Sequence, residues 1–177
     1  MTDTIDGSGF DGMWYMDKAR SRWWDRATNR WIEEPVLAQT LRTVHHDDVF
    51  EGWAAVKPRE GVVHHLRYRV RFDDREWAPY TCVAIEGEDH SEPSAALKSG
   101  IRVGQPLAYL KQVWVDERTQ YRICRNPDGT AQYVMMRRLS EDGSTNTGTC
   151  LAPDGVTFVS KVFTRVKPAD GIDVLGD

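Results

Sequence analysis

The hydrophobic and polar positions of the chain alternate most strictly from Val62 to Phe72, in the segment VVHHLRYRVRF. Side chains of a β-strand point alternately to its two faces, so this pattern predicts a half-buried strand. Its even positions form an apolar face that is interrupted by His64 and Tyr68, whereas arginines dominate the odd positions. We therefore expect His64 and Tyr68 to lie in the interior of the protein, where they could line a cavity.

Short segments with the same period recur along the chain, separated by turn residues. The predicted strands are Leu41 to Val44, Val49 to Val56, Val62 to Phe72, Trp77 to Ile85, Ala108 to Val115, Thr119 to Arg125, Ala131 to Leu139, Thr145 to Leu151 and Val156 to Val166. Short strands at close spacing, with Asp-Gly turns between them, are typical of an all-β barrel or sandwich. Because closing a sheet removes its edge strands, we expect an antiparallel up-and-down barrel of about eight strands. Gly52 and Gly148 leave the register of two strands open by one residue.

A tryptophan-rich segment extends from Arg20 to Leu37. Trp24, Thr28 and Trp31 fall on one helical face, and Pro35 would end a helix, so the segment predicts a short helix or ordered loop that forms a lid over the barrel. The alternative is that these rings pack on the outside of the sheet. The domain is expected to span residues 10–168, between a loose lead-in (1–9) and a C-terminal tail (169–177). A further helical turn is expected over Ser94 to Ser99.

The start of the predicted domain carries a motif that resembles the first strand of lipocalins and of the wider calycin group. The motif consists of Phe10, Gly12, Trp14, Asp17, Lys18 and Ser21. This set is similar to small bacterial lipocalin-like barrel proteins. The resemblance implies a lipocalin-like barrel with a hydrophobic cavity, and it implies that Arg165, near the last strand, packs across Trp14 to close one end of the barrel.

Composition narrows the classes of function. The 177 residues, 40% hydrophobic and 10% aromatic, can bury one substantial core. The net charge of −4, with both signs interleaved, provides no basic field for nucleic acid. Apolar runs are too short for a membrane span, and the N-terminus does not resemble a signal peptide, so we expect a soluble cytoplasmic protein. Three widely spaced cysteines predict buried thiols rather than disulfides.

The interior face of the predicted strand Val62 to Phe72 suggests acid–base chemistry. His64 can act as a base or acid near neutral pH, and Tyr68 could donate a hydrogen bond to a developing oxyanion. Asp48 or Glu51, on the adjacent strand, could orient the imidazole. The residues expected to line the substrate cavity are His46, Trp53, Tyr121, Tyr133, Met135, Arg137 and Trp24. This set suits cofactor-free elimination, isomerisation or cyclisation of an apolar, aromatic small molecule.

The run His45-His46-Asp47-Asp48 resembles a set of metal ligands. Neighbours in a strand point to opposite faces, so one site could use only one residue of each pair. A zinc site made of His46, Asp48 and His64 is the alternative that the residue types leave open. The preferred interpretation is a solvated turn with one inward histidine, without a metal or any other cofactor.

Two classes of function therefore remain. The first is a cofactor-independent lyase, isomerase or cyclase centred on His64, which is the preferred hypothesis because an interior histidine flanked by tyrosine is more polar than a passive cavity requires. The second is a non-catalytic carrier or sensor of a hydrophobic small molecule. A catalyst should bring His64, a carboxylate and a tyrosine to one point, whereas a carrier needs only apolar walls. Either class could form a homodimer.

Overall fold

The computed structural model describes residues 5–88 and 100–176. In this part of the chain, the structure contains eleven β-strands and one short 3-10 helix, η1 (Ser8–Phe10). The strands are β1 (Gly12–Asp25), β2 (Arg30–Glu33), β3 (Ala38–His46), β4 (Val49–Arg59), β5 (Val62–Arg71), β6 (Ala78–Glu86), β7 (Pro106–Asp116), β8 (Thr119–Arg125), β9 (Ala131–Leu139), β10 (Thr145–Leu151) and β11 (Thr157–Thr164). The helical turn expected over Ser94 to Ser99 lies outside the described residues.

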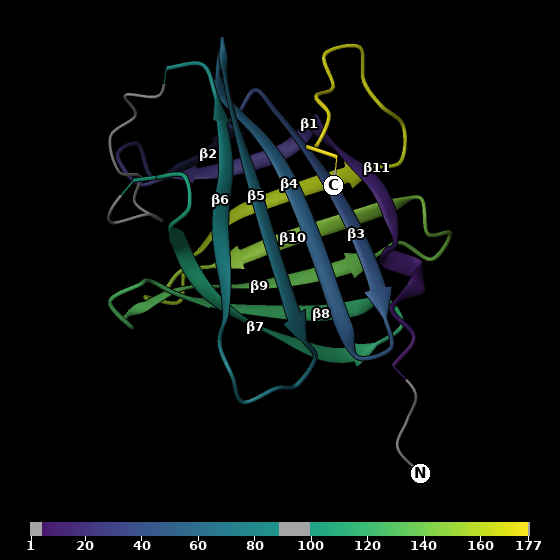
Figure 1. Cartoon of the computed structure of the whole chain (residues 1–177). Coiled ribbons are helices and arrows are strands. Elements are labelled where there is room, and N and C mark those ends of the chain that lie inside the picture. The colour runs from purple at the N-terminus through teal and green to yellow at the C-terminus, as the bar shows by residue number, and fades with distance from the viewer. Residues whose placement is uncertain (1–4, 89–99, 177) are drawn as a thin grey trace.

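Ten of these strands form one closed antiparallel barrel. From β3 to β11 each strand pairs with the next along the chain, and β1 joins β3 on one side and β11 on the other. The ring of ten corrects the expectation of about eight strands, since all the long predicted strands take part in closure and a wider ring encloses a larger interior. Figure 1 shows β3 to β6 as one layer that crosses over the layer formed by β7 to β11.

The tryptophan-rich segment is a β-hairpin, so the predicted helical lid is wrong. β1 continues to Asp25 and pairs with β2, which places Trp24 opposite Trp31. The two rings meet edge to face, with centroids 5.6 Å apart. Asn29 takes the left-handed conformation that the hairpin tip requires (φ 52°). Helical spacing could not detect this pairing, because cross-strand aromatic contacts depend on how the chain folds back on itself.

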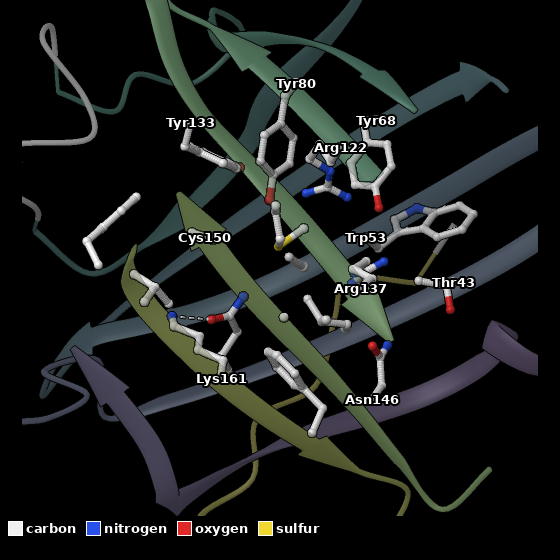
Figure 2. A pocket seen from close by; sticks show the side chains of 18 of the residues that line it. Thr43, Trp53, Tyr68, Tyr80, Arg122, Tyr133, Arg137, Asn146, Cys150 and Lys161 are labelled. Atoms are coloured by element: carbon white, nitrogen blue, oxygen red, sulfur yellow. Dashed lines mark hydrogen bonds between the residues drawn. The ribbon is translucent and has the colours of Figure 1, made fainter. Parts of the chain in front are cut away.

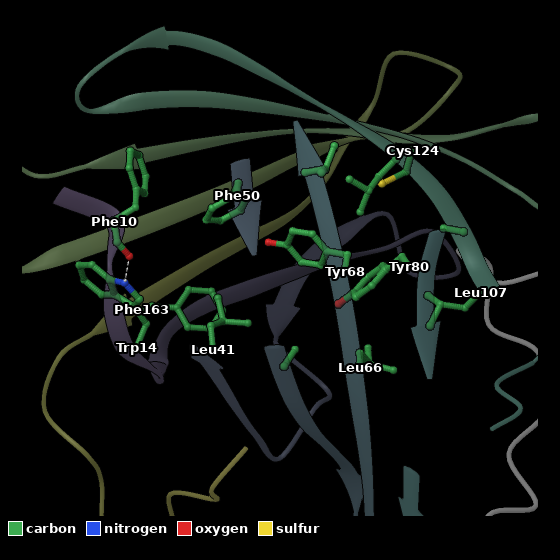
Figure 3. Packing of buried hydrophobic residues seen from close by; sticks show 14 of the residues in the cluster. Phe10, Trp14, Leu41, Phe50, Leu66, Tyr68, Tyr80, Leu107, Cys124 and Phe163 are labelled. Carbon is green, nitrogen blue, oxygen red and sulfur yellow. Dashed lines mark hydrogen bonds between the residues drawn. The ribbon is translucent and has the colours of Figure 1, made fainter. Parts of the chain in front are cut away.

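The alternation along β5 sets the inner face of the barrel, as predicted. Leu66, Tyr68, Val70 and Phe72 are all buried, while the intervening arginines are exposed. Their side chains pack in one apolar cluster with residues from most other strands, including Phe50 of β4 (Figure 3). Cys82, Cys124 and Cys150 are buried free thiols, as the cysteine spacing predicts.

One end of the barrel is closed by the segment that precedes β1. The Trp14 indole donates a hydrogen bond to the Phe10 carbonyl (2.8 Å), and the Arg165 guanidinium lies 4.0 Å from the indole centroid. The same guanidinium donates to the carbonyls of Gly9 (2.9 Å) and Asp11 (2.7 Å). The predicted contact between Arg165 and Trp14 is therefore confirmed.

The lead-in is not loose where the structure describes it, because Ile5 packs against the core. The C-terminal segment also returns to the barrel, where the Ile172 carbonyl accepts a hydrogen bond from Thr40 (2.5 Å).

Over residues 5–88 and 100–176, no helix has the length and hydropathy needed to cross a membrane.

Candidate functional site

A cavity of about 190 Å³ lies between the two layers of strands (Figure 2). Aromatic and aliphatic side chains form most of its wall, among them Trp23, Leu41, Val159 and Phe163. Polar side chains reach it from β8, β9, β10 and β11. A concave, mostly apolar space with a few convergent polar groups has the character of a small-molecule site.

Two glycines shape this interior. A methyl group added at Gly52 would lie only 2.2 Å from the ring of Tyr68, so the absence of a side chain on β4 lets the Tyr68 ring lie across that strand. At Gly148 an added methyl would meet the sulfur of Met135 at 3.3 Å. Strand pairing continues without a break at both positions, which removes the one-residue uncertainty left by the sequence.

Two arginines point into the cavity. Arg122 of β8 and Arg137 of β9 are 5% and 4% exposed. The Arg122 guanidinium lies over the Tyr68 ring at 4.2 Å, and that of Arg137 lies 5.8 Å from the centroid of Phe50. Within the described part of the chain neither arginine forms an ion pair, and Nε and Nη2 of Arg122 and Nη1 of Arg137 have no hydrogen-bond partner. Two positive charges thus lie in a largely apolar cavity without a carboxylate beside them.

Burial controls the protonation of the neighbouring groups. It lowers the pKa of Arg137, and the positive charge of Arg122 acts in the same direction. Burial raises the pKa of Tyr80 and that of the Cys150 thiol, each to about 12, and it raises the pKa of Tyr133 well above its ordinary value. The two phenols are therefore neutral at physiological pH and can donate hydrogen bonds, while the thiol is not ionised.

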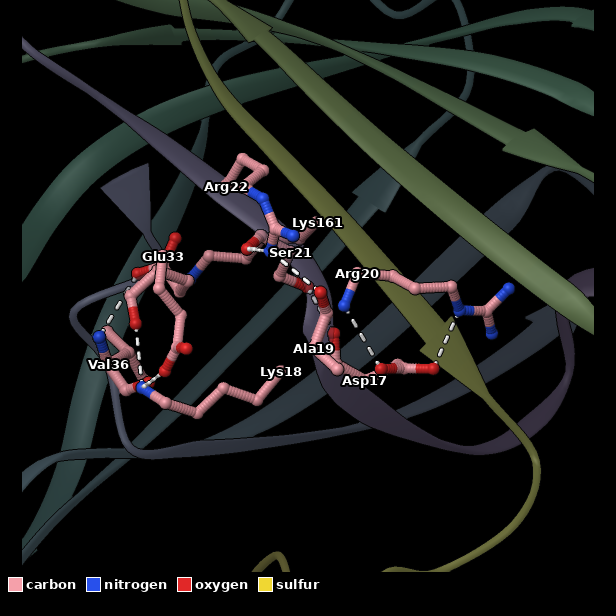
Figure 4. A network of polar contacts seen from close by, with 10 residues as sticks. Asp17, Lys18, Ala19, Arg20, Ser21, Arg22, Glu33, Val36 and Lys161 are labelled. Atoms are coloured by element: carbon pink, nitrogen blue, oxygen red, sulfur yellow. Dashed lines mark hydrogen bonds and ion pairs between the residues drawn. The ribbon is translucent and has the colours of Figure 1, made fainter. Parts of the chain in front are cut away.

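A third cation on the cavity wall is already neutralised. Lys161 donates a hydrogen bond to the side-chain oxygen of Gln39 (2.7 Å) and lies 3.4 Å from a carboxylate oxygen of Glu34, which is 1% exposed. Figure 4 shows the surrounding polar network, in which Lys18 donates to the carbonyls of Glu34 (2.7 Å) and Val36 (2.9 Å). The excess positive charge of the cavity therefore comes from the arginines.

His64, the predicted base, does not line this cavity. Its side chain is buried on the inner face of β5, opposite Val56 and Ile85. Tyr68 lies four residues further along the same face, a separation of about 13 Å in an extended strand. The structure therefore does not bring His64 and Tyr68 within hydrogen-bond reach of one point.

The two predicted carboxylates face away from His64. Asp48 forms an ion pair with Arg71 (2.9 Å), and Glu51 lies 3.1 Å from Arg69. Glu51 is directly opposite Arg69 in the β4–β5 pairing, on the face that points out of the barrel. The prediction that either carboxylate orients the imidazole is wrong, because strand register placed the partners on the other face.

The predictions for the cavity wall are met on β9 but not on β8. Tyr133, Met135 and Arg137 all line the cavity. On β8 the buried positions include Gln120, Arg122 and Cys124, and Tyr121 alternates with them, so it points outward and its predicted inward orientation is wrong. Reading the more hydrophobic residues as interior inverted this strand, because its inner face is unusually polar.

Trp53, a further predicted residue, lines the cavity from β4, and its ring also lies against the guanidinium groups of Arg42 (4.7 Å) and Arg67 (5.1 Å). Two other predicted residues, His46 and Trp24, lie elsewhere. His46 is exposed at the end of β3. Trp24 lies beside a separate hollow near the hairpin tip, while its neighbour Trp23 lines the cavity.

The inward histidine of the predicted turn is His45. Its Nδ1–H donates to Asp11 (2.6 Å), and its Nε2 accepts from the side-chain amide of Gln120 (3.2 Å). The alternative zinc site is not formed, since His46 is exposed, Asp48 pairs with Arg71 and His64 is buried. In residues 5–88 and 100–176 no cluster of three His, Cys, Asp or Glu side chains could hold a metal ion.

The cavity-lining side chains that the sequence interpretation missed include Arg122, Tyr80, Asn146 and Trp23. Arg122 stands between Tyr121 and Ile123, and a charged residue between two hydrophobic ones is normally predicted to be exposed. Only the structure shows that Arg122 is buried. The polar residue Asn146 carries no period-two signal of its own, although Gly148 and Cys150 share its face of β10.

The fold and the site define a closed antiparallel β-barrel with an interior cavity whose polar groups include two buried arginines. No family model matches the chain, and no curated protein or solved structure is detectably similar to it.

Proposed function

We propose that this protein is a non-catalytic carrier or sensor that binds a small molecule with an apolar body inside the barrel. The observation that carries the proposal is the concave, largely aromatic and aliphatic cavity, whose wall does not include His64. A carrier needs only this concave surface with a few orienting polar groups. Closure of the barrel end by the segment before β1 supports retention of a ligand in the interior.

The same features support a lipocalin-like assignment. A closed antiparallel barrel, with an arginine from beyond the last strand over the tryptophan of the first, is what the resemblance of the N-terminal motif implies. Fold alone does not determine function, so the proposed binding role rests on the cavity and not on this likeness.

A cofactor-independent enzyme is the second candidate. Its support is the pair of neutral phenols, Tyr80 and Tyr133, beside two guanidinium groups, a set that could stabilise an oxyanion. This reading needs a general base, and His64 would have to reach the ligand from outside the cavity wall.

The first prediction separates these candidates by tryptophan fluorescence, with Trp23 on the cavity wall as the reporter. Wild type is titrated with a panel of aromatic and terpenoid ligands, and ligand mass is followed in the same samples. We expect saturable binding without a change in mass. Binding should be kept in His64→Ala and lost in Ala54→Phe, because Ala54 lines the cavity and a phenyl ring would fill it.

Ala131→Phe, at an exposed position at the start of β9, is the matched control and should bind normally. Near-ultraviolet circular dichroism checks that each variant is folded. Absence of binding by wild type across the panel contradicts the proposal. Conversion of a ligand by wild type, lost in His64→Ala while binding persists, would establish the enzyme instead.

A further inference from the structure

We infer that the ligand is an organic anion of the carboxylate class, whose charged group binds between Arg122 and Arg137 beside Asn146. This inference rests on the proposed function, since it specifies the chemistry of the molecule that occupies the same cavity. It follows from three observations: unbalanced buried charge, an unpartnered buried amide, and the division of the cavity into a polar and an aromatic end.

The first observation is the burial of two cations without an anion. Removing a guanidinium from water is costly unless an opposite charge and hydrogen bonds replace its hydration. Arg122 and Arg137 are each at least nine-tenths buried, and three of their nitrogens have no partner in the described part of the chain. A carboxylate accepts hydrogen bonds from guanidinium groups in a planar, charge-assisted geometry, so it would satisfy both requirements at once.

Contacts with aromatic rings do not satisfy the N–H donors of these arginines. Arg122 lies over Tyr68 and Tyr80, at 4.2 and 5.5 Å, and such contacts stabilise the cation through the face of each ring. They leave the edge of the guanidinium, which carries the N–H donors, unoccupied. Nε and Nη2 of Arg122 thus keep hydrogen-bonding capacity that no described residue uses.

The second observation is Asn146, which lines the same cavity from β10. It is 1% exposed, and neither its Nδ2 nor its Oδ1 has a hydrogen-bond partner among the described residues. Figure 2 shows the side chains of Arg137 and Asn146 at one side of the cavity. The amide nitrogen adds a donor for an oxyanion, and the amide oxygen can accept from a hydroxyl group next to it.

The third observation is the direction of polarity along the strands. On β9 Arg137 lies four residues from Tyr133, and on β10 Asn146 lies four residues from Cys150, which is opposite Val159. Val159 in turn pairs with Trp23 of β1. Arg137 and Asn146 therefore lie toward one end of the cavity and Tyr133, Cys150 and Trp23 toward the other, with Arg122 between them, opposite Met135. This order fits an amphipathic acid whose charged group lies between Arg137 and Arg122.

The position of Lys161 narrows the anion site further. Its ammonium already contacts Gln39 and Glu34, so an anion placed there would meet the Glu34 carboxylate. Neither arginine has such a competing carboxylate in the described part of the chain, and the groups that most affect the pKa of Arg137, besides its burial, are Tyr68, Arg122, Tyr80 and Tyr133.

The second prediction is tested by isothermal titration calorimetry with 2-naphthoate and with its neutral counterpart 2-naphthamide. We expect wild type to bind 2-naphthoate at least about tenfold more tightly than 2-naphthamide, since hydrogen bonds to charged groups are the stronger ones. Arg122→Met and Arg137→Met should each remove most of this preference. Arg138→Met changes the exposed neighbour on β9 and should leave the preference intact.

Thermal unfolding of the same variants gives an independent readout. Because the methionine removes an unbalanced buried charge, we expect the melting temperature of Arg122→Met to stay the same or to rise. A variant that fails to fold would contradict the inference, since it would assign the arginine to stability instead of ligand recognition.

The possible outcomes separate the inference from the function on which it rests. Equal binding of both probes by wild type, or a preference that survives in both methionine variants, overturns the anion site and leaves the carrier proposal standing. Absence of binding by either probe counts against both. Preference for 2-naphthoate that is lost in Arg122→Met and Arg137→Met but kept in Arg138→Met supports both.

Discussion

At the scale of single residues, burial shifts the pKa values of polar side chains inside the barrel. His45 is an example, since its ring stacks on Phe72 with 7° between the planes and bonds to Asp11 and Gln120. Burial lowers the pKa of His45, and this effect outweighs the hydrogen bond that His45 donates to Asp11, which raises it; Arg137 adds a smaller lowering effect. The folded protein therefore holds this imidazole in its neutral form.

The third prediction follows from that shift. Because the folded pKa lies below the ordinary value of 6.5, the unfolded chain binds more protons just below pH 6.5. The free energy of unfolding should therefore fall as the pH drops through this window, by up to about 1.4 kcal/mol per pH unit from this group. Urea unfolding between pH 5 and 8 measures the slope.

Two variants isolate the contribution of His45. His45→Gln should flatten the slope relative to wild type, whatever it does to the absolute stability. His46→Gln, at the exposed neighbouring position, should leave the slope as it is. Identical slopes in wild type and His45→Gln would show that the buried imidazole does not titrate as its surroundings imply.

At the scale of elements, pairs of strands decide where the large side chains of the cavity lie. Tyr68 of β5 lies over Gly52 of β4, its direct partner in the pairing, and its ring meets that of Tyr80 edge to face at 5.3 Å. The pair β8–β9 brings Arg122 opposite Met135. Each of these large side chains on the cavity wall thus has room because its cross-strand neighbour is small or flexible.

The fourth prediction compares Gly52 and Gly148, the two glycines that shape the interior. Gly52→Ala places a methyl 2.2 Å from the Tyr68 ring, so we expect a loss of about 1–3 kcal/mol in the free energy of unfolding. Gly148→Ala meets only the flexible Met135 at 3.3 Å and should cost less than about 1 kcal/mol. Urea denaturation measures both. Equal costs would argue against the close approach of Tyr68 to β4.

At the scale of the whole molecule, the barrel depends on the seam between its first and last strands. The β1–β11 pairing is interrupted between Asp17 and Arg22. Ser21 lies in this interruption, fully buried, where its hydroxyl donates to the Asp17 carbonyl (2.7 Å) and accepts from the Val162 amide (3.1 Å). The serine therefore satisfies a backbone donor that the bulge leaves out of the ladder.

The fifth prediction concerns this seam. Ser21→Ala should lower the free energy of unfolding by about 1–3 kcal/mol, because the partly buried Val162 amide loses its partner. Hydrogen exchange of that amide should also become faster. Ser160→Ala, on the facing strand, is the control, since its hydroxyl makes no hydrogen bond in the described part of the chain. A stable Ser21→Ala variant with unchanged exchange would mean that the seam does not need this contact.

How far the site could be foreseen differs from strand to strand. On β5 and β9 the inner faces were predicted correctly, and Tyr133, Met135 and Arg137 reach the cavity. On β8 the assignment failed at Tyr121, because hydrophobicity indicates the interior only where the interior is apolar. His64 lies on the predicted inner face of β5 but outside the cavity wall. A local sequence pattern shows which face of a strand is buried, but not which positions along that face line the cavity.

The amino-acid sequence by itself predicted the approximate positions of β3 to β11, that they are antiparallel neighbours, and which face of β5 is buried. Period-two alternation and turn residues are local features, so neighbouring residues are enough to read them. Only the tertiary structure decided that ten strands close the ring, that Trp24 pairs with Trp31, and that Arg122, Arg137 and Asn146 meet in one cavity. These outcomes depend on pairing register and closure between distant segments, where a shift of one residue exchanges the inside of a strand for its outside.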